Sequence, residues 1–134
     1  MNRPLKVCLE CGIEAWSNND LASTFLYDKR VKSKYRSKCK KCEHKRVMDY
    51  KYRTKFNLSY DDITAMKECR SYCCDICGRE ETSAKFRLLN VDHCHTTGEV
   101  RGILCGRCNT VLGHLGDDVA ILARAIEYLN GGNA

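Results

Sequence analysis

The 134-residue sequence lacks any apolar run long enough to span a membrane, and its start, Met-Asn-Arg-Pro-Leu-Lys-Val-Cys, contains no apolar signal core. Large aromatic apolar residues are also few, with 3 Phe and 1 Trp. In so small a chain the surface is large relative to the volume, and each half would struggle to bury enough apolar area unaided. These absences predict a protein without a membrane segment that needs another source of stability.

The 11 cysteines can supply that stability, either as disulfides or as metal ligands. A disulfide framework requires an oxidising compartment, and the chain shows no signal that would send it there. Most of the cysteines fall into Cys-x-x-Cys pairs, the pattern typical of zinc sites. The sequence therefore favours metal and predicts a reducing, cytosolic compartment.

Two groups of four cysteines have the spacing of a closed, tetrahedral structural zinc site. In both groups 27 residues separate the two pairs, which suggests an internal repeat, but the first group has no counterpart to Asp92-His-Cys-His95. His44 is an alternative ligand in the first group, although a solvated position beside Lys45 is favoured. We predict two zinc ions, one held by Cys8, Cys11, Cys39 and Cys42 and one by Cys74, Cys77, Cys105 and Cys108.

Positive charge is concentrated in residues 29–55, where 13 basic residues face 2 acidic ones, so that this segment alone exceeds the chain's net charge of +6. A field of this sign attracts phosphate groups. Tyrosines within or beside the segment can stack on bases, whereas the plain alternative is a solvated charged surface. We favour contact with DNA or RNA, and the predicted nucleic-acid-binding residues of this segment are Lys38, Lys40, Lys41, Lys45 and Arg46.

The expected elements of the N-terminal half are a zinc-binding unit and two helices. Its small core should contain Trp16, Phe25 and Leu26. A polar, basic helix is expected over residues 43–56, broken at 57–59. Ser59 should cap the next helix. The side chains of that helix that follow core-facing spacing are Tyr60, Ile63, Met66, Cys69 and Cys73, with Cys69 a small buried hydrophobe.

The C-terminal half should begin with a turn over 78–85, followed by a hairpin whose strands cover residues 86–91 and 100–104, joined by a turn at 96–99. A short helix should start at Asn109. Asp117 should cap a last amphipathic helix, which ends at Asn130-Gly-Gly. We expect its apolar stripe to cover the hairpin, with a homodimer contact as the alternative.

Two kinds of metal chemistry meet in this half. Asp92, His93, His95 and Asn109 are hard oxygen and imidazole groups, suited to a hydrolytic metal and a general base. Strand alternation places His93 and His95 on one face and Cys94 on the other, so that Cys94 is a packing residue. Asp92 can join the same site only if the strand curls. The cysteine quartet should fix the distance between the hairpin and Asn109.

Residues 74–130 resemble the recombination endonuclease VII family of phage nucleases, within the HNH or ββα-metal superfamily. The resemblance lies in Cys-x-x-Cys, Val-Asp-His-x-His, Thr-Gly-x-Val-Arg-Gly-x-Leu-Cys-x-x-Cys-Asn, Leu-Gly and a final Ala-x-x-Tyr-Leu, all in order. It implies that His93 is the general base and that Asp92 and Asn109 hold one Mg²⁺, for which Mn²⁺ can substitute. His95 would orient the phosphate, and Arg101 would contact phosphate or form a structural salt bridge.

The chain departs from the family at two positions. Cys94 stands where the family often has Asp, and Leu112 stands where the junction-resolving prototype has Glu. The missing glutamate makes nuclease activity a firmer expectation than the resolution of four-way junctions. The substrate expected from the resemblance is duplex, nicked or branched DNA, in the cytosol of a bacterial host if the chain is phage-encoded.

The sequence as a whole predicts an α+β fold in which a small zinc-stabilised ββα-metal (HNH) nuclease domain follows a four-cysteine zinc-binding unit. The expected boundaries are 1–43 for the N-terminal zinc unit, 44–73 for a basic helical connector and 74–134 for the nuclease. The predicted activity is Mg²⁺-dependent hydrolysis of DNA phosphodiesters by an endonuclease. The alternative is a non-catalytic zinc-finger protein that binds nucleic acid, which would have no need of a base at His93.

Overall fold

The chain has an α+β fold built from short antiparallel hairpins and helices. A computed structural model describes residues 3–80 and 89–132, and the chain divides into two compact units, Met1–Tyr60 and Asp61–Ala134. Within the described residues, every helix is too short or too polar to cross a lipid bilayer. Each unit has its own small core and its own cysteine quartet.

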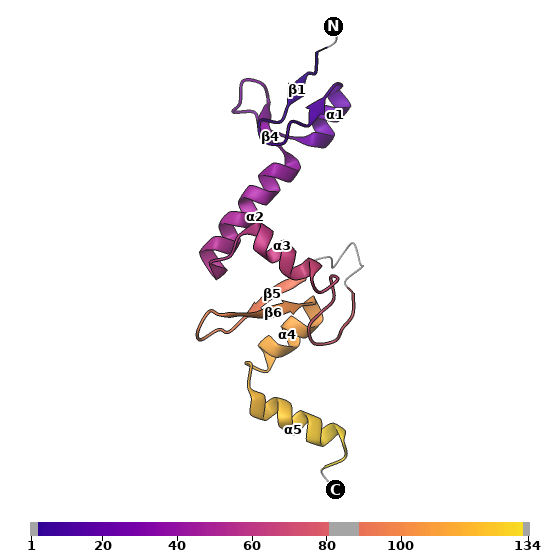
Figure 1. Ribbon diagram of the computed structural model, residues 1–134, viewed down its shortest axis with the longest axis vertical. Helices are drawn as coiled ribbons and strands as arrows, with labels where there is room; N and C mark the ends of the chain where they lie inside the picture. The colour runs from indigo at the N-terminus through magenta and orange to yellow at the C-terminus, as the bar shows by residue number, and fades with distance from the viewer. Residues whose placement is uncertain (1–2, 81–88, 133–134) are drawn as a thin grey trace. The chain divides into compact units, whose positions relative to one another are not determined.

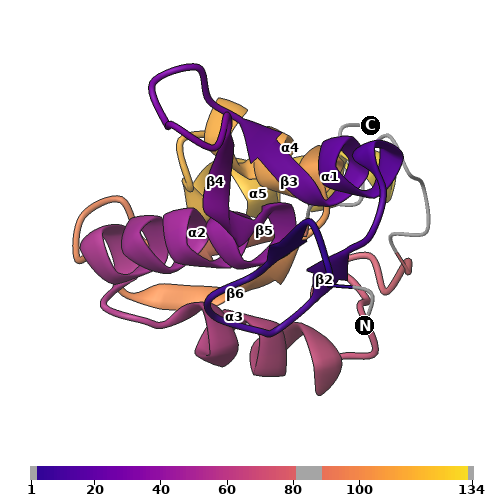
Figure 2. The same ribbon diagram turned by 90° about the horizontal axis from the view of Figure 1, so that it is seen from above.

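The first unit contains two hairpins followed by a long helix (Figures 1 and 2). The first hairpin surrounds the first cysteine pair, and the second leads into the helix. In chain order its elements are β1 (Lys6–Val7), β2 (Glu14–Ala15), α1 (Asn18–Thr24), β3 (Phe25–Tyr27), β4 (Tyr35–Cys39) and α2 (Lys40–Phe56).

Local sequence explains where the helices of this unit begin and end. Ser17 and Asp20 form a capping box at α1, in which the Ser17 hydroxyl accepts from the Asp20 N–H and the Asp20 carboxylate accepts from the Ser17 N–H. The helix expected over 43–56 begins three residues earlier, at Lys40, directly after the strand that ends at Cys39. It ends as predicted, because Asn57 adopts a left-handed conformation with φ of 55°.

The core of the first unit consists of Cys8, Ala15, Phe25 and Cys39. Only Phe25 of the predicted core is buried, since Trp16 is 50% exposed and Leu26 is 38% exposed. Each of these two follows a buried residue, Ala15 or Phe25, and successive residues of an extended chain point to opposite faces. Cysteine sulfurs therefore take the place of the large apolar side chains that the prediction assigned to this core.

The second unit places a hairpin and a short helix between two further helices. Its elements are α3 (Tyr60–Glu68), β5 (Asn90–His93), β6 (Val100–Leu104), α4 (Gly106–His114) and α5 (Val119–Leu129). The second strand matches its prediction. The first strand runs to His93, and the predicted residues 86–88 lie outside the described residues, as do 81–85 of the predicted turn. The predicted turn at 96–99 is present, with Gly98 at φ of 77°.

Helix α3 turns Ile63 into the core and packs Met66 against it, as predicted. The prediction for Cys69 is wrong, because this residue is exposed. The helix ends at Glu68, so the helical spacing that placed Cys69 on the buried face no longer applies there. Cys73 is half-buried and forms an isolated bridge with Glu80 around the cysteine pair that follows it.

The last two helices start at residues other than those predicted. Helix α4 begins at Gly106 rather than Asn109, because the sulfur of Cys105 accepts from the Cys108 N–H and so caps the helix. Helix α5 is capped by Asp118 and not by Asp117, since the Asp118 carboxylate accepts from the N–H groups of Ala120 and Ile121. The cap therefore leaves the Asp117 carboxylate available for other contacts.

Helix α5 has the predicted amphipathic sequence and ends as predicted at Asn130, followed by Gly131 with φ of 79°. Its apolar stripe does not cover the hairpin: Val119 is 77% exposed, Ile126 62% and Leu129 81%. None of its residues is buried. The expectation that this stripe packs on the hairpin is therefore wrong, and the homodimer contact stays a prediction.

Candidate metal and nuclease site

An irregularity in the hairpin of the second unit sets the direction of the site residues. Asp92 pairs with Gly102 and His93 with Val100, so β6 contains one extra residue, Arg101, at this point. A bulge of this kind bends the strand and re-aims the side chains beside it. The strand therefore has the kind of curl that the prediction required for Asp92 and His93 to belong to one site.

Two histidines lie together at the end of β5. The ring centroids of His93 and His95 are 5.1 Å apart and the rings meet edge to face. His93 is half-buried and His95 is exposed, so this end of the hairpin is accessible from solvent. Between them, Cys94 is half-buried, and its sulfur accepts from the Thr97 N–H at 3.4 Å within the turn.

Asp92 is buried, with 8% of its surface exposed, and its charge is balanced by Arg101. The Arg101 Nε donates to Asp92 Oδ2 at 2.7 Å, and Nη2 donates to Oδ1 at 3.1 Å. The same Nη2 lies 3.2 Å from Asp117 Oδ2, which in turn lies 3.8 Å from His95 Nδ1. Asp92, followed by Asp117, raises the pKa of Arg101. The sequence left two alternatives for Arg101, a phosphate contact or a structural salt bridge, and the structure contains the salt bridge.

Asn109 lies on α4, which packs against both β5 and β6 (Figure 1). It follows directly after the last cysteine of the quartet, and its N–H donates to the Cys105 carbonyl at 3.0 Å. A carboxylate and a side-chain amide provide the oxygen donors that Mg²⁺ prefers. The donor chemistry of Asp92 and Asn109 therefore fits a hard divalent cation.

Both cysteine quartets have the geometry of a zinc site. In each, the four sulfurs lie within 4.8 Å of one another. The Cys11 and Cys39 sulfurs are 3.7 Å apart, and those of Cys77 and Cys105 are 3.9 Å apart. Tetrahedral zinc with Zn–S bonds of ~2.3 Å separates its sulfurs by about 3.8 Å. The two predicted quartets can therefore each hold a metal ion, and His44 belongs to neither.

The peptide backbone favours the thiolate form of one cysteine in each quartet. Burial by itself opposes ionisation of Cys74, but N–H groups of Cys77, Cys105 and Ile76 donate to its sulfur and lower its pKa to about 6. The pKa of Cys8 is also lowered to about 6, against the effect of burial, by N–H groups of Cys11, Cys39 and Glu10. Burial and the neighbouring sulfurs of Cys105, Cys77 and Cys74 raise the pKa of Cys108 to about 12. A bound cation would favour the thiolate form of all four.

Asp75 lies between Cys74 and Cys77 and connects the second quartet to the hairpin through hydrogen bonds. Its N–H donates to the Ile103 carbonyl at 3.0 Å, and its carboxylate accepts from the Ile103 N–H at 2.8 Å. The carboxylate lies directly over Gly102, where a side-chain Cβ would overlap it. Because Gly102 pairs with Asp92, this contact links the cysteine frame to the site. Sequence reasoning missed Asp75 and Gly102, although a glycine inside a strand signals a close approach.

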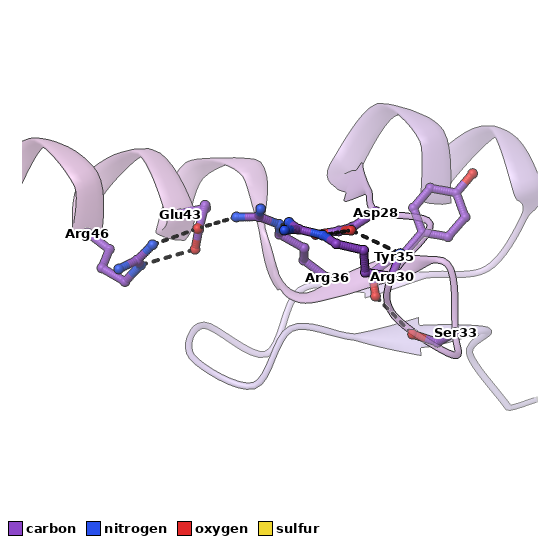
Figure 3. Close-up of polar contacts among 7 residues, drawn as sticks. All are labelled: Asp28, Arg30, Ser33, Tyr35, Arg36, Glu43 and Arg46. Atoms are coloured by element: carbon purple, nitrogen blue, oxygen red, sulfur yellow. Dashed lines mark hydrogen bonds and ion pairs between the residues drawn. The ribbon is translucent and has the colours of Figure 1, made fainter.

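In the first unit, alternating charges form a row from the loop after β3 to helix α2 (Figure 3). Arg36 joins the two carboxylates of the row, since it donates to Asp28 at 3.3 Å and to Glu43 at 2.7 Å. Arg30 and Arg46 bind the outer sides of these carboxylates. The pKa of Asp28 is held below its ordinary value by Arg30 above all, and that of Glu43 by Arg46 and then Arg36, against the effect of burial.

Most of the predicted nucleic-acid-binding residues have partners within the first unit. Lys38 pairs with Glu10, and Lys40 donates to the Ala22 carbonyl at 2.7 Å. Lys45 lies 5.7 Å from the centre of the Tyr60 ring, and Arg46 binds Glu43. Lys41 is exposed. Surface ion pairs of this kind contribute little energy, so phosphate groups can exchange with them.

Comparison with known proteins assigns the chain to a family. Residues 48–131, more than half of the chain, match recombination endonuclease VII. The chain therefore belongs to the recombination endonuclease VII family. It is 40% identical over 75 residues to the Gene 59 proteins of Mycobacterium phages D29 and L5. That match covers 55% of this chain and 44% of each relative, so the chain spans less than half the length of these relatives.

Among solved structures, the chain is similar to the ββα-Me type II restriction endonuclease Hpy99I. The likeness covers 96% of this chain and 66% of that chain, with 28% sequence identity and a TM-score of 0.42.

Proposed function

We propose that this protein is a metal-dependent DNA endonuclease that hydrolyses phosphodiester bonds at the end of the β5–β6 hairpin. The observation that carries the proposal is the strand irregularity, which bends the chain between the buried Asp92 and the accessible His93, in a member of the recombination endonuclease VII family. A buried carboxylate beside a solvent-accessible imidazole pair suits the binding of a cation and the removal of a proton from water.

Each residue has a separate role in this proposal. His93 accepts the proton of the attacking water, and the neighbouring His95 orients the phosphate. Asp92 and Asn109 hold Mg²⁺ or Mn²⁺, which would supply charge stabilisation at the scissile phosphate and the leaving 3′ oxygen. The products would carry 5′-phosphate and 3′-hydroxyl ends. The two cysteine quartets hold structural zinc, which would make their local structure rigid.

DNA is the proposed substrate, and residues 29–55 supply most of its electrostatic attraction. At the position of the prototype's glutamate, Leu112 packs against the core of the second unit. This position therefore provides no carboxylate, and the proposal covers DNA cleavage in general. Duplex, nicked and four-way-junction DNA of matched sequence would reveal any preference.

The test is Mg²⁺-dependent cleavage of those three substrates by the zinc-loaded chain and by His93→Ala. His114→Ala is the matched control, because His114 is an exposed histidine at the end of α4. His93→Ala should lower the cleavage rate ~10²–10⁴-fold, the usual contribution of general-base catalysis, and retain zinc and DNA binding. His114→Ala should cleave like the parent.

A second variant distinguishes the loss of the general base from the loss of a metal ligand. Asn109→Ala should weaken Mg²⁺ binding, so part of its lost activity should return at higher Mg²⁺ concentration, whereas His93→Ala should gain nothing from added metal. If pure His93→Ala protein cuts DNA at the parent rate, the nuclease assignment at this site is wrong. If the parent binds DNA and never cleaves it, the non-catalytic zinc-finger alternative replaces the proposal.

A further inference from the structure

The carboxylate proposed to hold the catalytic metal already has a cation partner. Both oxygens of Asp92 accept hydrogen bonds from Arg101, at 2.7 Å and 3.1 Å. A guanidinium and a divalent cation on one carboxylate repel each other and compete for the same oxygens, although the partly exposed Arg101 side chain is screened in part by water. Metal binding at Asp92 therefore requires that Arg101 give up part of its contact.

A second carboxylate is in place to keep the guanidinium when this happens. Asp117 Oδ2 lies 3.2 Å from Arg101 Nη2, the nitrogen that also donates to Asp92. The Asp117 side chain is 20% exposed, and Asp118 supplies the cap of α5. Gly116 and Asp117 both have positive φ, 63° and 59°, and this turn carries the chain from α4 to α5.

We infer that Asp117 is a positioning residue for metal binding: it retains Arg101 when the metal takes Asp92, and so lowers the cost of the exchange. The inference rests on the proposed function, since it assumes that Asp92 is a metal ligand. Asp117 acts through Arg101 and does not itself touch the metal. Its 3.8 Å contact with His95 Nδ1 also places it beside the proposed phosphate-orienting histidine.

If Asp117 acts through Arg101, the effect of replacing Asp117 on metal affinity should depend on whether Arg101 is present. A merely structural role of Asp117 would not give this dependence. When an uncharged side chain replaces the Asp117 carboxylate, Asp92 is the carboxylate that Arg101 still contacts among the described residues. An incoming cation must then displace Arg101 from Asp92 fully. With Arg101 removed, none of the described side chains competes for Asp92, and the charge of Asp117 no longer matters to this exchange. The two substitutions should therefore be strongly non-additive.

The experiment measures Mn²⁺ binding by electron paramagnetic resonance on the zinc-loaded full chain without DNA. Asp117→Asn should weaken Mn²⁺ about tenfold, in the range for residues that orient metal ligands. The matched control is Asp118→Asn, which should bind Mn²⁺ like the parent because asparagine also caps helices well. Arg101→Gln should bind Mn²⁺ more tightly than the parent, and adding Asp117→Asn to it should cause no further loss.

A tenfold loss that persists in the Arg101→Gln background would overturn the inference, because Asp117 would then act as a ligand or through the fold. Mn²⁺ binding that depends on Asp92 and not on Asp117 would also overturn it, while leaving the proposed function intact. Mn²⁺ binding that is unchanged by Asp92→Asn would refute the metal site itself, and the inference with it.

A measurement on the parent and Asp117→Asn alone covers the case in which Arg101→Gln does not fold. The Nη–H signals of Arg101, followed by nuclear magnetic resonance, should stay protected from solvent exchange when Mg²⁺ saturates the parent, because Asp117 still holds Nη2 of the guanidinium. In Asp117→Asn the same titration should remove that protection. Equal loss of protection in both proteins would contradict the inference.

Discussion

The two units place different side chains on one local arrangement. In both, a cysteine pair in a tight turn precedes an antiparallel hairpin, a second cysteine pair and a helix whose N-cap position is the first cysteine of that pair. The Leu9 N–H donates to the Ser37 carbonyl at 3.1 Å, and the corresponding Asp75 N–H donates to Ile103 at 3.0 Å. The two units thus share this local arrangement as well as the spacing of 27 residues between their cysteine pairs.

The units differ in the residues that the arrangement presents. The strand that ends with His93 in the second unit ends with the exposed Tyr27 in the first. Directly after the last cysteine stands Asn109 in one unit and Glu43 in the other, where the carboxylate binds Arg36 and Arg46. The same local frame thus carries the proposed hydrolytic residues in one unit and the row of alternating charges in the other. This difference indicates that the cysteines determine the frame and the hairpin side chains determine its chemistry.

The largest expected effect comes from removing one quartet at a time. Cys105→Ser should unfold the second unit and abolish cleavage, whereas Cys39→Ser should unfold the first unit and leave one zinc ion bound. The reason is that metal binding supplies most of the folding energy of such small units, ~10–16 kcal/mol for a structural zinc. Zinc content by elemental analysis, together with amide spectra of each unit, would measure this. Loss of both zinc ions from either variant would contradict the separation of the units.

A second substitution tests the electrostatic role of the first unit. Replacing Lys38, Lys40, Lys41, Lys45 and Arg46 with glutamine should weaken DNA binding and reduce its salt dependence. Each lost phosphate contact removes about 0.9 from the slope of log affinity against log salt concentration, so five lost contacts should lower the slope by up to about 4.5. Binding titrations between low and moderate salt, with zinc content as the folding control, check this. An unchanged slope would make the segment a solvated surface.

Gly102→Ala tests the contact between cysteine frame and site, which exists only in the second unit. The added Cβ would overlap the Asp75 carboxylate, and such overpacking typically costs ~1–3 kcal/mol. Gly106→Ala is the matched control, since open space surrounds that position. Thermal unfolding of the zinc-loaded protein should show a lower midpoint for the first variant alone. Equal midpoints for both would mean that Asp75 can move away at no cost.

The smallest effect is expected for Glu43→Gln in the first unit, about 1 kcal/mol of stability through its hydrogen bonds to arginine. The arginines depress the pKa of Glu43, so its contribution is present above the ordinary carboxyl pKa and lost as the pH falls through the lower, folded value. Unfolding midpoints of parent and variant should therefore converge in acid. Glu14→Gln, on an exposed strand residue, is the control and should match the parent throughout.

The parts of the fold that the sequence predicted correctly are those governed by local rules. Cysteine spacing gave both quartets, and alternation together with turn residues gave β6 and the 96–99 turn. The errors concern tertiary choices. Nothing local decides whether Trp16 or Ala15 faces a core, or whether the stripe of α5 finds a partner. In the same way, the doubled Asp117-Asp118 offers two caps, and only the three-dimensional structure shows which one contacts Arg101.

For the site as well, the sequence predicted some of the residues and missed others. Residue type and spacing led to Asp92, His93, His95 and Asn109, whose roles remain proposals. The bulge at Arg101 was not predictable, because one extra residue in a strand leaves no mark in a pattern of alternation. The role of Asp75 was not predictable either. From the sequence alone, an aspartate between two zinc-binding cysteines is expected to be solvated, and only the structure shows its hydrogen bond to Ile103.

The pattern of exposure within the quartets has a consequence for handling the protein. Each quartet has two buried sulfurs, one half-buried, and one on an exposed residue, Cys11 or Cys77. Within the quartets, alkylating reagents and peroxides meet these two residues first, and a modified sulfur is no longer a good metal ligand. Chemical damage to the quartets should therefore begin at Cys11 and Cys77, with the release of zinc from an otherwise intact chain. Preparations would need a mild reductant that does not chelate zinc, and a colorimetric assay for free zinc would report damage before any loss of solubility.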